Sequence, residues 1–213
     1  MGVTLATRTG TPHTDTVERL RVQAAEHPHS AFVRLELGIA LQARGDGAGA
    51  RRAWREAVRV QPDTPAAVRA EDRLHPDEPP GIPPFIPSFN RPRTRVERLL
   101  ARGASYQAAL RPVSAERAFA AAARAAPNDP QAQVAAAVGL FSKERPALAF
   151  SQLGPLAQRF PHAQTVRFHL GLLLIFIRQF PAARRELALA AAEGPQTPLG
   201  KRARLLLKAG SKA

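Results

Sequence analysis

The residues that could bind a nucleotide or a phosphate group lie in two glycine-containing stretches. Gly45 to Ala50 (GDGAGA) matches the loose form of a dinucleotide-binding glycine motif, which requires a preceding strand. The surrounding pattern places this stretch between two helices, so no nucleotide site is predicted there. Gly194 to Lys201 resembles a phosphate-binding loop, but its glycine spacing is one residue too long. Arg202 also stands where that motif needs serine or threonine, so this stretch predicts no phosphate loop either.

The histidines and the absence of cysteine give no catalytic or metal chemistry. A chain without cysteine has no disulfides, thiolate ligands or cysteine nucleophiles. His27 and His29 flank Pro28 without a neighbouring set of carboxylates, which argues against a metal site. His162 and His169 are predicted to be a turn residue and a packed helix residue. Because no GxSxG or HExxH motif occurs either, the sequence predicts no enzyme, no cofactor and no metal.

The dominant pattern in the chain is a spacing of 34 residues between positions of the same kind. Prolines repeat at this spacing, and columns of small or bulky residues stand at fixed distances before them. The prolines are Pro28, Pro62, Pro127, Pro161 and Pro195. The columns of small residues are Gly38, Gly103, Ala137 and Gly171, then Ala50, Ala115, Ala149 and Ala183, and then Ala57, Ala122, Leu156 and Ala190. The column of bulky residues is Trp54, Phe119, Leu153 and Leu187. A period of this length is typical of stacked helical hairpins.

Each column has a physical reason in a helical hairpin. Small residues let two helices approach closely, and a bulky residue is expected to fill the gap between one hairpin and the next. Proline after a second helix ends it. Pro112, Pro146 and Pro181 stand where second helices should begin, and a first-turn proline loses no hydrogen bond there. Asp46 is the predicted N-cap at the corresponding place in the first hairpin.

This pattern resembles the tetratricopeptide repeat family. The matching units are residues 31–64, 96–129, 130–163 and 164–197, and LELGIALQARGDGAGARRAWREAVRVQPD is the best single match. Ala137 and Leu156 depart from the glycine and the small residue that the family pattern expects. The resemblance implies an all-α protein, a right-handed solenoid of stacked antiparallel helical hairpins. It also implies a concave groove lined by the first helices and a role as a scaffold that binds other proteins.

The segments outside these units complete the expected domain organisation. The repeat register breaks between Pro62 and Pro127, where seven prolines between Pro76 and Pro92 predict an extended connector. The expected segments are a flexible N-terminus (1–13), N-terminal helices that include one full repeat (14–75), the proline-rich connector (76–93), three tandem repeats (94–197), and a basic capping helix with a tail (198–213).

The connector contains more apolar side chains than a solvated linker needs. Ile82, Phe85, Ile86 and Phe89 are interleaved with its prolines. Because large apolar side chains are usually buried, we expect the connector to pack against helices of its own chain rather than against a foreign partner.

The resemblance places mostly apolar residues on the groove lining: Phe32, Leu35, Ile39, Leu100, Val134, Val138, Phe141, Phe168, Leu172, Ile175 and Phe176. Some members of the family hold a peptide carboxylate through lysine, asparagine and arginine. The matching positions here carry Leu35, Ile39, Leu100 and Ala104, so that clamp is not expected. An apolar groove suits an amphipathic helix, a segment of the same chain such as the connector, or a second copy of the protein. A segment of the same chain is the preferred occupant.

The net charge of +14 is confined to the second part of the chain. Residues 1–90 contain 11 basic and 11 acidic side chains, whereas residues 91–213 contain 20 basic and 6 acidic ones. Such a field attracts polyanions. The candidate polyanion surface comprises Arg91, Arg93, Arg95, Arg98, Arg102, Arg184, Arg185, Lys201, Arg202, Arg204 and Lys208. An acidic protein, nucleic acid and an anionic membrane surface all suit it, and a solvated surface without a ligand is the alternative. Base stacking has little support, because Tyr106 is the only tyrosine and Trp54 belongs to a packing column.

These observations predict a cytoplasmic protein without a membrane span. The most apolar stretch, Leu170 to Ile177, is far shorter than the roughly 20 residues that a spanning helix needs, and the N-terminus lacks the pattern of a secretion signal. The predicted function is a noncatalytic adaptor whose basic second part engages an acidic partner protein. The alternatives are a ribosome- or nucleic-acid-associated protein that uses the same arginines, and a structural homo-oligomer closed through Phe168 to Ile177.

Overall fold

The structure, a computed structural model, describes the backbone of residues 12–210 and the side chains of residues 16–210. Within this range the regular elements are eleven α-helices, and no strand occurs. The chain divides into two compact units, unit 1 (Met1–Leu74) and unit 2 (His75–Ala213). Of the expected flexible N-terminus, residues 1–11 lie outside the described range, as do the tail residues 211–213. Residues 12 and 13 belong to a helix, so the expected flexible segment is too long by two residues.

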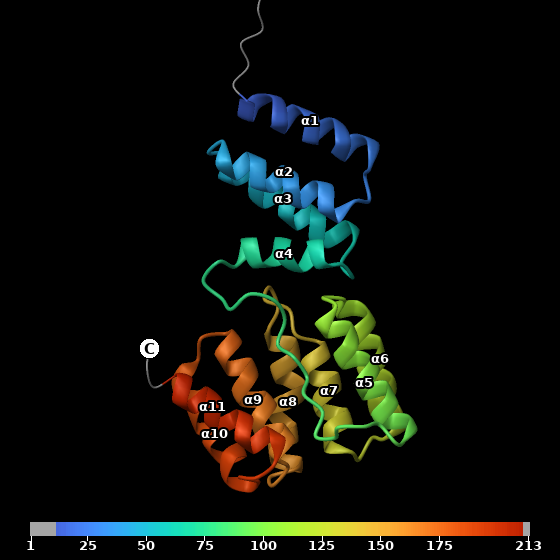
Figure 1. Cartoon of the computed structure of the whole chain (residues 1–213), viewed down its shortest axis with the longest axis vertical. Coiled ribbons are helices and arrows are strands. Elements are labelled where there is room, and N and C mark those ends of the chain that lie inside the picture. The colour runs from blue at the N-terminus through green and yellow to red at the C-terminus, as the bar shows by residue number, and fades with distance from the viewer. Residues whose placement is uncertain (1–11, 211–213) are drawn as a thin grey trace, which may run out of the picture. The chain divides into compact units, whose positions relative to one another are not determined.

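Unit 1 consists of one complete helical hairpin with a helix on either side of it (Figure 1). Its elements are α1 (Pro12–Glu26), α2 (Ala31–Ala43), α3 (Gly47–Val60) and α4 (Pro65–Leu74). Each helix packs on the next, and α2 also contacts α4. Asp46 caps α3 as predicted, because its carboxylate accepts a hydrogen bond of 2.7 Å from the Gly49 amide.

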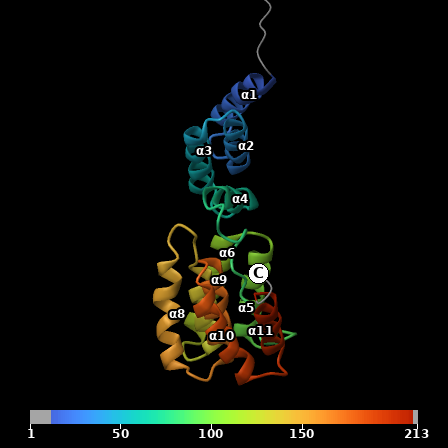
Figure 2. The same ribbon diagram turned by 90° about the vertical axis from the view of Figure 1, so that its left-hand side faces the viewer.

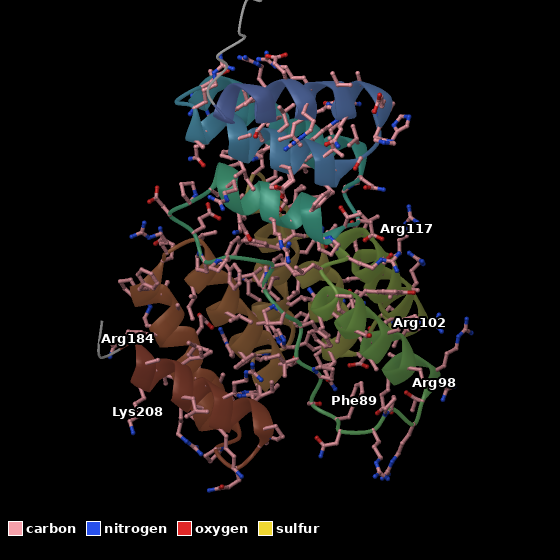
Figure 3. All side chains as sticks on the ribbon, turned by 45° about the horizontal axis from the view of Figure 1, so that its top comes forward. Phe89, Arg98, Arg102, Arg117, Arg184 and Lys208 are labelled. Carbon is pink, nitrogen blue, oxygen red and sulfur yellow. The ribbon has the colours of Figure 1, made fainter. Side chains whose placement is uncertain are left out.

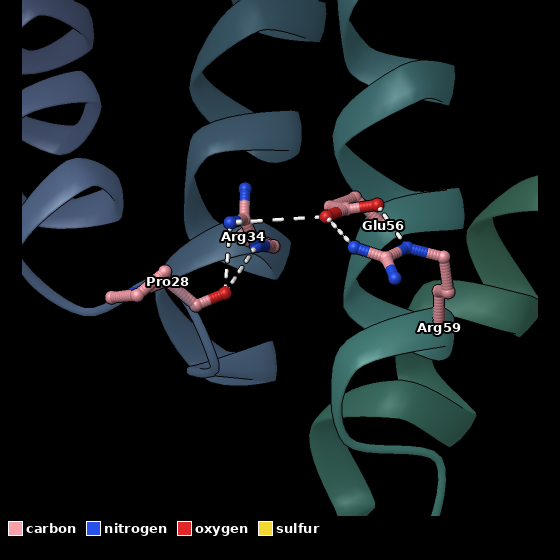
Figure 4. A network of polar contacts seen from close by, with 4 residues as sticks. All are labelled: Pro28, Arg34, Glu56 and Arg59. Atoms are coloured by element: carbon pink, nitrogen blue, oxygen red, sulfur yellow. Dashed lines mark hydrogen bonds and ion pairs between the residues drawn. The ribbon is translucent and has the colours of Figure 1, made fainter.

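The charges of unit 1 are partly paired within the unit (Figure 4). Arg34 donates to the Pro28 carbonyl oxygen at 2.8 Å from Nη2 and 3.3 Å from Nε, which ties the turn after α1 to α2. Arg59 donates two hydrogen bonds of 2.6 and 2.7 Å to Glu56, and Arg34 lies 3.9 Å from the same carboxylate. The hydrogen bonds from Arg59 hold the pKa of Glu56 below its ordinary value, so this carboxylate stays charged beside the two arginines.

Unit 2 contains the three predicted hairpins and a final single helix (Figures 1 and 2). Its helices are α5 (Arg95–Ala108), α6 (Pro112–Ala125), α7 (Pro130–Gly139), α8 (Ala147–Arg159), α9 (Gln164–Phe176), α10 (Phe180–Glu193) and α11 (Pro198–Ala209). The first helices α5, α7, α9 and α11 contact one another in this order and form one layer. The second helices α6, α8 and α10 pack on the first helices before and after them. Within the described residues each unit is therefore an all-α stack of antiparallel hairpins, as predicted.

The repeat columns form the contact between the two helices of a hairpin. A Cβ atom at Gly38 would overlap the Trp54 indole, and one at Gly103 would overlap the Phe119 ring. At Gly171 a Cβ atom would lie 2.8 Å from Leu187 Cγ. We expected the bulky residues to fill the gap between one hairpin and the next. They also fill the space beside the glycine of the first helix within their own hairpin. The other members of the columns, Ala50, Ala57, Ala115, Ala122, Ala137, Ala149, Leu153, Leu156, Ala183 and Ala190, are buried.

The substitution Gly103→Ala is expected to lower the stability of unit 2 by about 1–3 kcal/mol, because the new methyl group must displace the Phe119 ring. Helix propensity alone would predict a gain of up to about 1 kcal/mol. Gly47→Ala in α3 is the control, since a Cβ atom there meets only the end of the Arg51 side chain, at 3.6 Å. Denaturant unfolding followed by circular dichroism should show opposite shifts for the two variants. Equal stabilisation by both would contradict the close packing.

The turns inside the hairpins repeat as well. Gly45, Leu110 and Arg178 follow the first helices of three hairpins and have positive φ angles of 86°, 54° and 60°. Glycine adopts this conformation without strain, whereas leucine and arginine do so at a cost. The hairpin of α7 and α8 has a longer turn instead, residues 140–146, and this turn reaches the connector. Among the helices that the structure describes, none has both the length and the apolar composition needed to cross a membrane.

Candidate functional site

The proline-rich connector (76–93) lies along the layer of first helices in unit 2 and fills the predicted groove. It contains no helix or strand, as expected. Phe85 is only 3 % exposed; its ring meets Phe119 edge-on with 5.3 Å between centroids and stacks on His169 at 5.0 Å. Ile86 and Phe89 pack against the same core. The prediction that the connector packs against helices of its own chain is therefore confirmed.

A glutamine on α5 holds the connector backbone around Phe85. The side-chain oxygen of Gln107 accepts a hydrogen bond of 2.7 Å from the Phe85 amide. The Nε2 group of Gln107 donates to the Pro83 carbonyl oxygen at 3.1 Å. Because Gln107 is buried, one side chain satisfies its own polar atoms and two backbone groups of the connector together.

Three further side chains bind the connector backbone from other elements. His169 on α9 accepts from the Ile86 amide at 2.9 Å, and Gln131 on α7 accepts from the Ser88 amide at 2.9 Å. Lys143 in the turn between α7 and α8 donates to the Pro79 carbonyl oxygen at 2.7 Å.

The proline content of the connector suits a segment that is covered by helices. Proline has no amide hydrogen, so a proline-rich segment brings few backbone donors that would need partners on burial. The amides of Phe85, Ile86 and Ser88 each have a side-chain acceptor. The connector is therefore held mainly by specific side-chain contacts to its backbone and by one deeply buried aromatic ring.

His169 occupies the centre of this arrangement as a neutral base. Its Nδ1 atom lies 2.7 Å from the Thr165 carbonyl oxygen, and its Nε2 atom accepts from the Ile86 amide. These partners place the proton of the neutral ring on Nδ1. Complete burial lowers the pKa of His169 to about 4, although the hydrogen bond to Thr165 acts in the opposite direction. His169 is a packed helix residue and His162 a turn residue, as predicted, but the contact of His169 with the connector was not predicted.

The predicted groove residues are mostly covered rather than open to a partner. Eight of the eleven are buried: Leu35, Leu100, Val134, Val138, Phe141, Phe168, Leu172 and Phe176. Ile39 and Ile175 are partly buried, and Phe32 is 60 % exposed. In unit 2 the core and the connector cover these side chains, so this groove is not an open docking site. The segment from Phe168 to Ile177, through which a homo-oligomer was the alternative prediction, is likewise buried or partly buried.

The predicted polyanion residues are all exposed, but they form two groups rather than one surface. The first group, at the end of the connector and on α5, consists of Arg91, Arg93, Arg95, Arg98 and Arg102. The second, on α10 and α11, consists of Arg184, Arg185, Lys201, Arg202, Arg204 and Lys208. Figure 3 shows Arg98 and Arg102 on one side of unit 2 and Arg184 and Lys208 on the other.

The carboxylates of this region mostly have structural partners. Glu97 accepts hydrogen bonds from the Thr94 and Arg93 amides at 2.9 and 2.6 Å, and these bonds hold its pKa below the ordinary value. Asp129 caps α7. Glu186 pairs with Arg167 at 3.2 Å. Glu193 contacts His162 at 3.1 Å. Four of the six acidic residues after position 90 are therefore engaged in helix caps or polar pairs, and the exposed cations dominate the outer surface.

The stretch from Gly45 to Ala50 covers the turn after α2 and the first residues of α3, and the stretch from Gly194 to Lys201 covers the turn after α10 and the first residues of α11. In the part of the chain that the structure describes, no three metal-ligating side chains come together. Comparison of the sequence with protein-family models and with curated proteins finds no match.

Proposed function

We propose that the protein is a noncatalytic adaptor of tetratricopeptide type, in which the basic unit 2 engages an acidic protein partner in the cytoplasm. The 34-residue period supports the family, and the stacked hairpins are consistent with it. The observation that carries the partner class is the excess of exposed cations after position 90, where most carboxylates serve helix ends or polar pairs.

Because the connector fills the groove, we place the partner-binding surface on the outside of unit 2. A foreign peptide in the groove would have to displace Phe85 and the backbone contacts from Gln107, Gln131 and His169. The connector is part of the same chain, so its effective concentration at the groove is high and displacement is costly. The two cation groups need no such rearrangement, because they are exposed already.

We expect a partner held by these cations to associate more slowly as salt is raised, because salt screens long-range attraction between exposed charges. Neutralising Arg91, Arg93, Arg95, Arg98 and Arg102, or the group on α10 and α11, should lower the association rate constant by at least about tenfold at low salt. The measurement is stopped-flow or surface-based kinetics with an acidic partner captured from the native host. Replacement of the exposed Arg51, Arg52 and Arg55 on α3 is the matched control.

Nuclease treatment of the captured material separates a protein partner from nucleic acid. The same arginines suit phosphate groups, and contact with a ribosome or nucleic acid would have a steep salt dependence too. Partners that remain after nuclease treatment support the adaptor. Loss of all partners on nuclease treatment would show the phosphate-binding alternative instead. A complex whose association rate changes neither with salt nor in either set of variants would rule out both the acidic-protein and the nucleic-acid function.

A further inference from the structure

The surface of unit 2 has an apolar cavity next to its second cation group. The cavity has a volume of about 410 Å³ and lies between α9, α10 and α11. Its walls include Ile175, Phe180, Leu206 and Leu207, with Arg184 at the only charged position in the lining. Phe180 is 50 % exposed, which is unusual for a large aromatic side chain in a packed array.

Among residues 12–210, α11 is a first helix that is not followed by a second helix. It begins 34 residues after α9, and in the complete hairpins the second helix packs on the glycine column of the first. The residue of α11 in that column is Leu205, one period after Gly171, and it is 68 % exposed. Leu205 lies one helical turn before Ala209, which lines the cavity, so the exposed leucine stands beside the cavity on α11.

Unit 1 offers an internal comparison. Its last helix, α4, is also a first helix without a second one, and it begins 34 residues after α2. The residue in the glycine column of α4 is Asp72, one period after Gly38. This position carries a partly buried carboxylate in α4 and an exposed leucine in α11. The apolar surface on α11 is therefore not a general property of unpaired first helices in this chain.

The charges of α10 and α11 indicate which kind of partner fits this apolar surface. The sequence of α11 contains four basic residues and no acidic one, and the two carboxylates of α10 already contact Arg167 and His162. Arg184 and Lys208 lie on the same side of unit 2 as each other (Figure 3). A second copy of the chain docked through the same surface would bring like charges to this place, which electrostatic repulsion disfavours.

We propose that the cavity and Leu205, together the α11 docking surface, bind an amphipathic acidic helix of the partner. This helix lies on α11 as a second helix lies on its first helix in the complete hairpins, with apolar side chains in the cavity and carboxylates beside Arg184 and the cations of α11. The inference rests on the proposed function and adds the site and the conformation in which the acidic partner is recognised.

The test uses two synthetic acidic peptides of about four helical turns. One has leucines at the i, i+3, i+4, i+7 spacing of one helix face, and the other has the same composition in scrambled order. We expect the amphipathic peptide to bind the full chain at least about tenfold more tightly than the scrambled one in fluorescence anisotropy, a difference of about 1.4 kcal/mol. Leu205→Lys should remove this difference, whereas any gain from the added positive charge should be the same for both peptides because they have the same composition.

Leu148→Lys is the matched control, since Leu148 on α8 of the same unit is 44 % exposed and lies away from the cavity lining. Equal binding of the two peptides, with normal salt dependence, would overturn the α11 docking surface and leave the charge-based function standing. Binding of neither peptide would overturn both. A dimer that forms with rising concentration and is abolished by Leu205→Lys would show that a second copy occupies the surface, which also contradicts the proposal.

Discussion

Replacing Phe85 by alanine is expected to lower the free energy of unfolding of unit 2 by about 3–5 kcal/mol, the range found for deeply buried phenylalanines. Phe85 is 3 % exposed and contacts both the Phe119 ring and the His169 ring, so its removal leaves a cavity where α6, α9 and the connector meet. The loss should also loosen the connector, because Phe85 is its most deeply buried apolar side chain.

The two units can be followed separately in the same experiment. Trp54 is the only tryptophan and belongs to unit 1, so its fluorescence reports unit 1, whereas circular dichroism reports both units. Phe32→Ala is the matched control, because Phe32 is 60 % exposed and should cost little. A Phe85→Ala protein whose unit 2 unfolds at the wild-type denaturant concentration would show that the connector adds nothing to the stability of this unit.

The hairpins could be predicted because their determinants repeat within the chain. A small residue such as Gly103 or Ala137 faces a bulky residue such as Phe119 in the hairpins, so the same spatial requirement leaves the same spacing in the sequence. Prolines at the starts and ends of second helices add local signals that depend only on backbone geometry. Both kinds of signal are visible without knowledge of any long-range contact.

The contacts of the connector could be predicted only in outline. Apolar residues among its prolines indicated burial, but the side chains that hold its backbone are single polar residues outside the repeat columns. Gln107, Gln131 and His169 lie 22, 43 and 83 residues from the connector residues they bind. No spacing rule connects such pairs, because they depend on how three helices are placed in the assembled layer. The sequence therefore indicated that the groove would be filled but not by which contacts.

The two cation groups illustrate a related limit. The composition places the excess charge after position 90, but α5 and α11 lie at opposite ends of the first-helix layer, so the charge does not form one patch. Leu205, in contrast, could have been recognised from the sequence. It continues the column of Gly38, Gly103, Ala137 and Gly171, where a large side chain blocks the usual packing of a second helix.

Acidification should destabilise unit 2 through His169. Its pKa is near 6.5 in an unfolded chain and about 4 in the folded one, so between these pH values the unfolded chain binds one more proton. The stability contributed by the neutral ring is fully present above pH 6.5 and is lost progressively as the pH falls toward 4, by about 3 kcal/mol in total. Below that pH the folded protein takes up the proton too, and the loss levels off.

The contribution of His169 can be separated from that of the carboxylates by comparing how steeply the unfolding free energy falls with pH in different variants. The difference in unfolding free energy of unit 2 between pH 7 and pH 4.5 should be smaller in His169→Gln than in the wild-type protein, whatever the absolute stability of the variant. His29→Gln is the matched control, because His29 is exposed and belongs to unit 1. If His169→Gln does not fold, the NMR resonances of the His169 imidazole can be followed in the wild-type protein instead. A His169 resonance that titrates near pH 6.5 would contradict the depressed pKa.

The same protonation should release the connector, because a proton on Nε2 turns the acceptor of the Ile86 amide into a donor. Two N–H groups would then face each other in a site closed to water, which the folded unit can avoid only by moving one of them. We therefore expect proteolytic cleavage within residues 76–93 to accelerate on acidification before the helices unfold, with an acid-active protease and His169→Gln as the comparison. Cleavage that follows global unfolding at every pH would show that the connector and the helices of unit 2 separate only together.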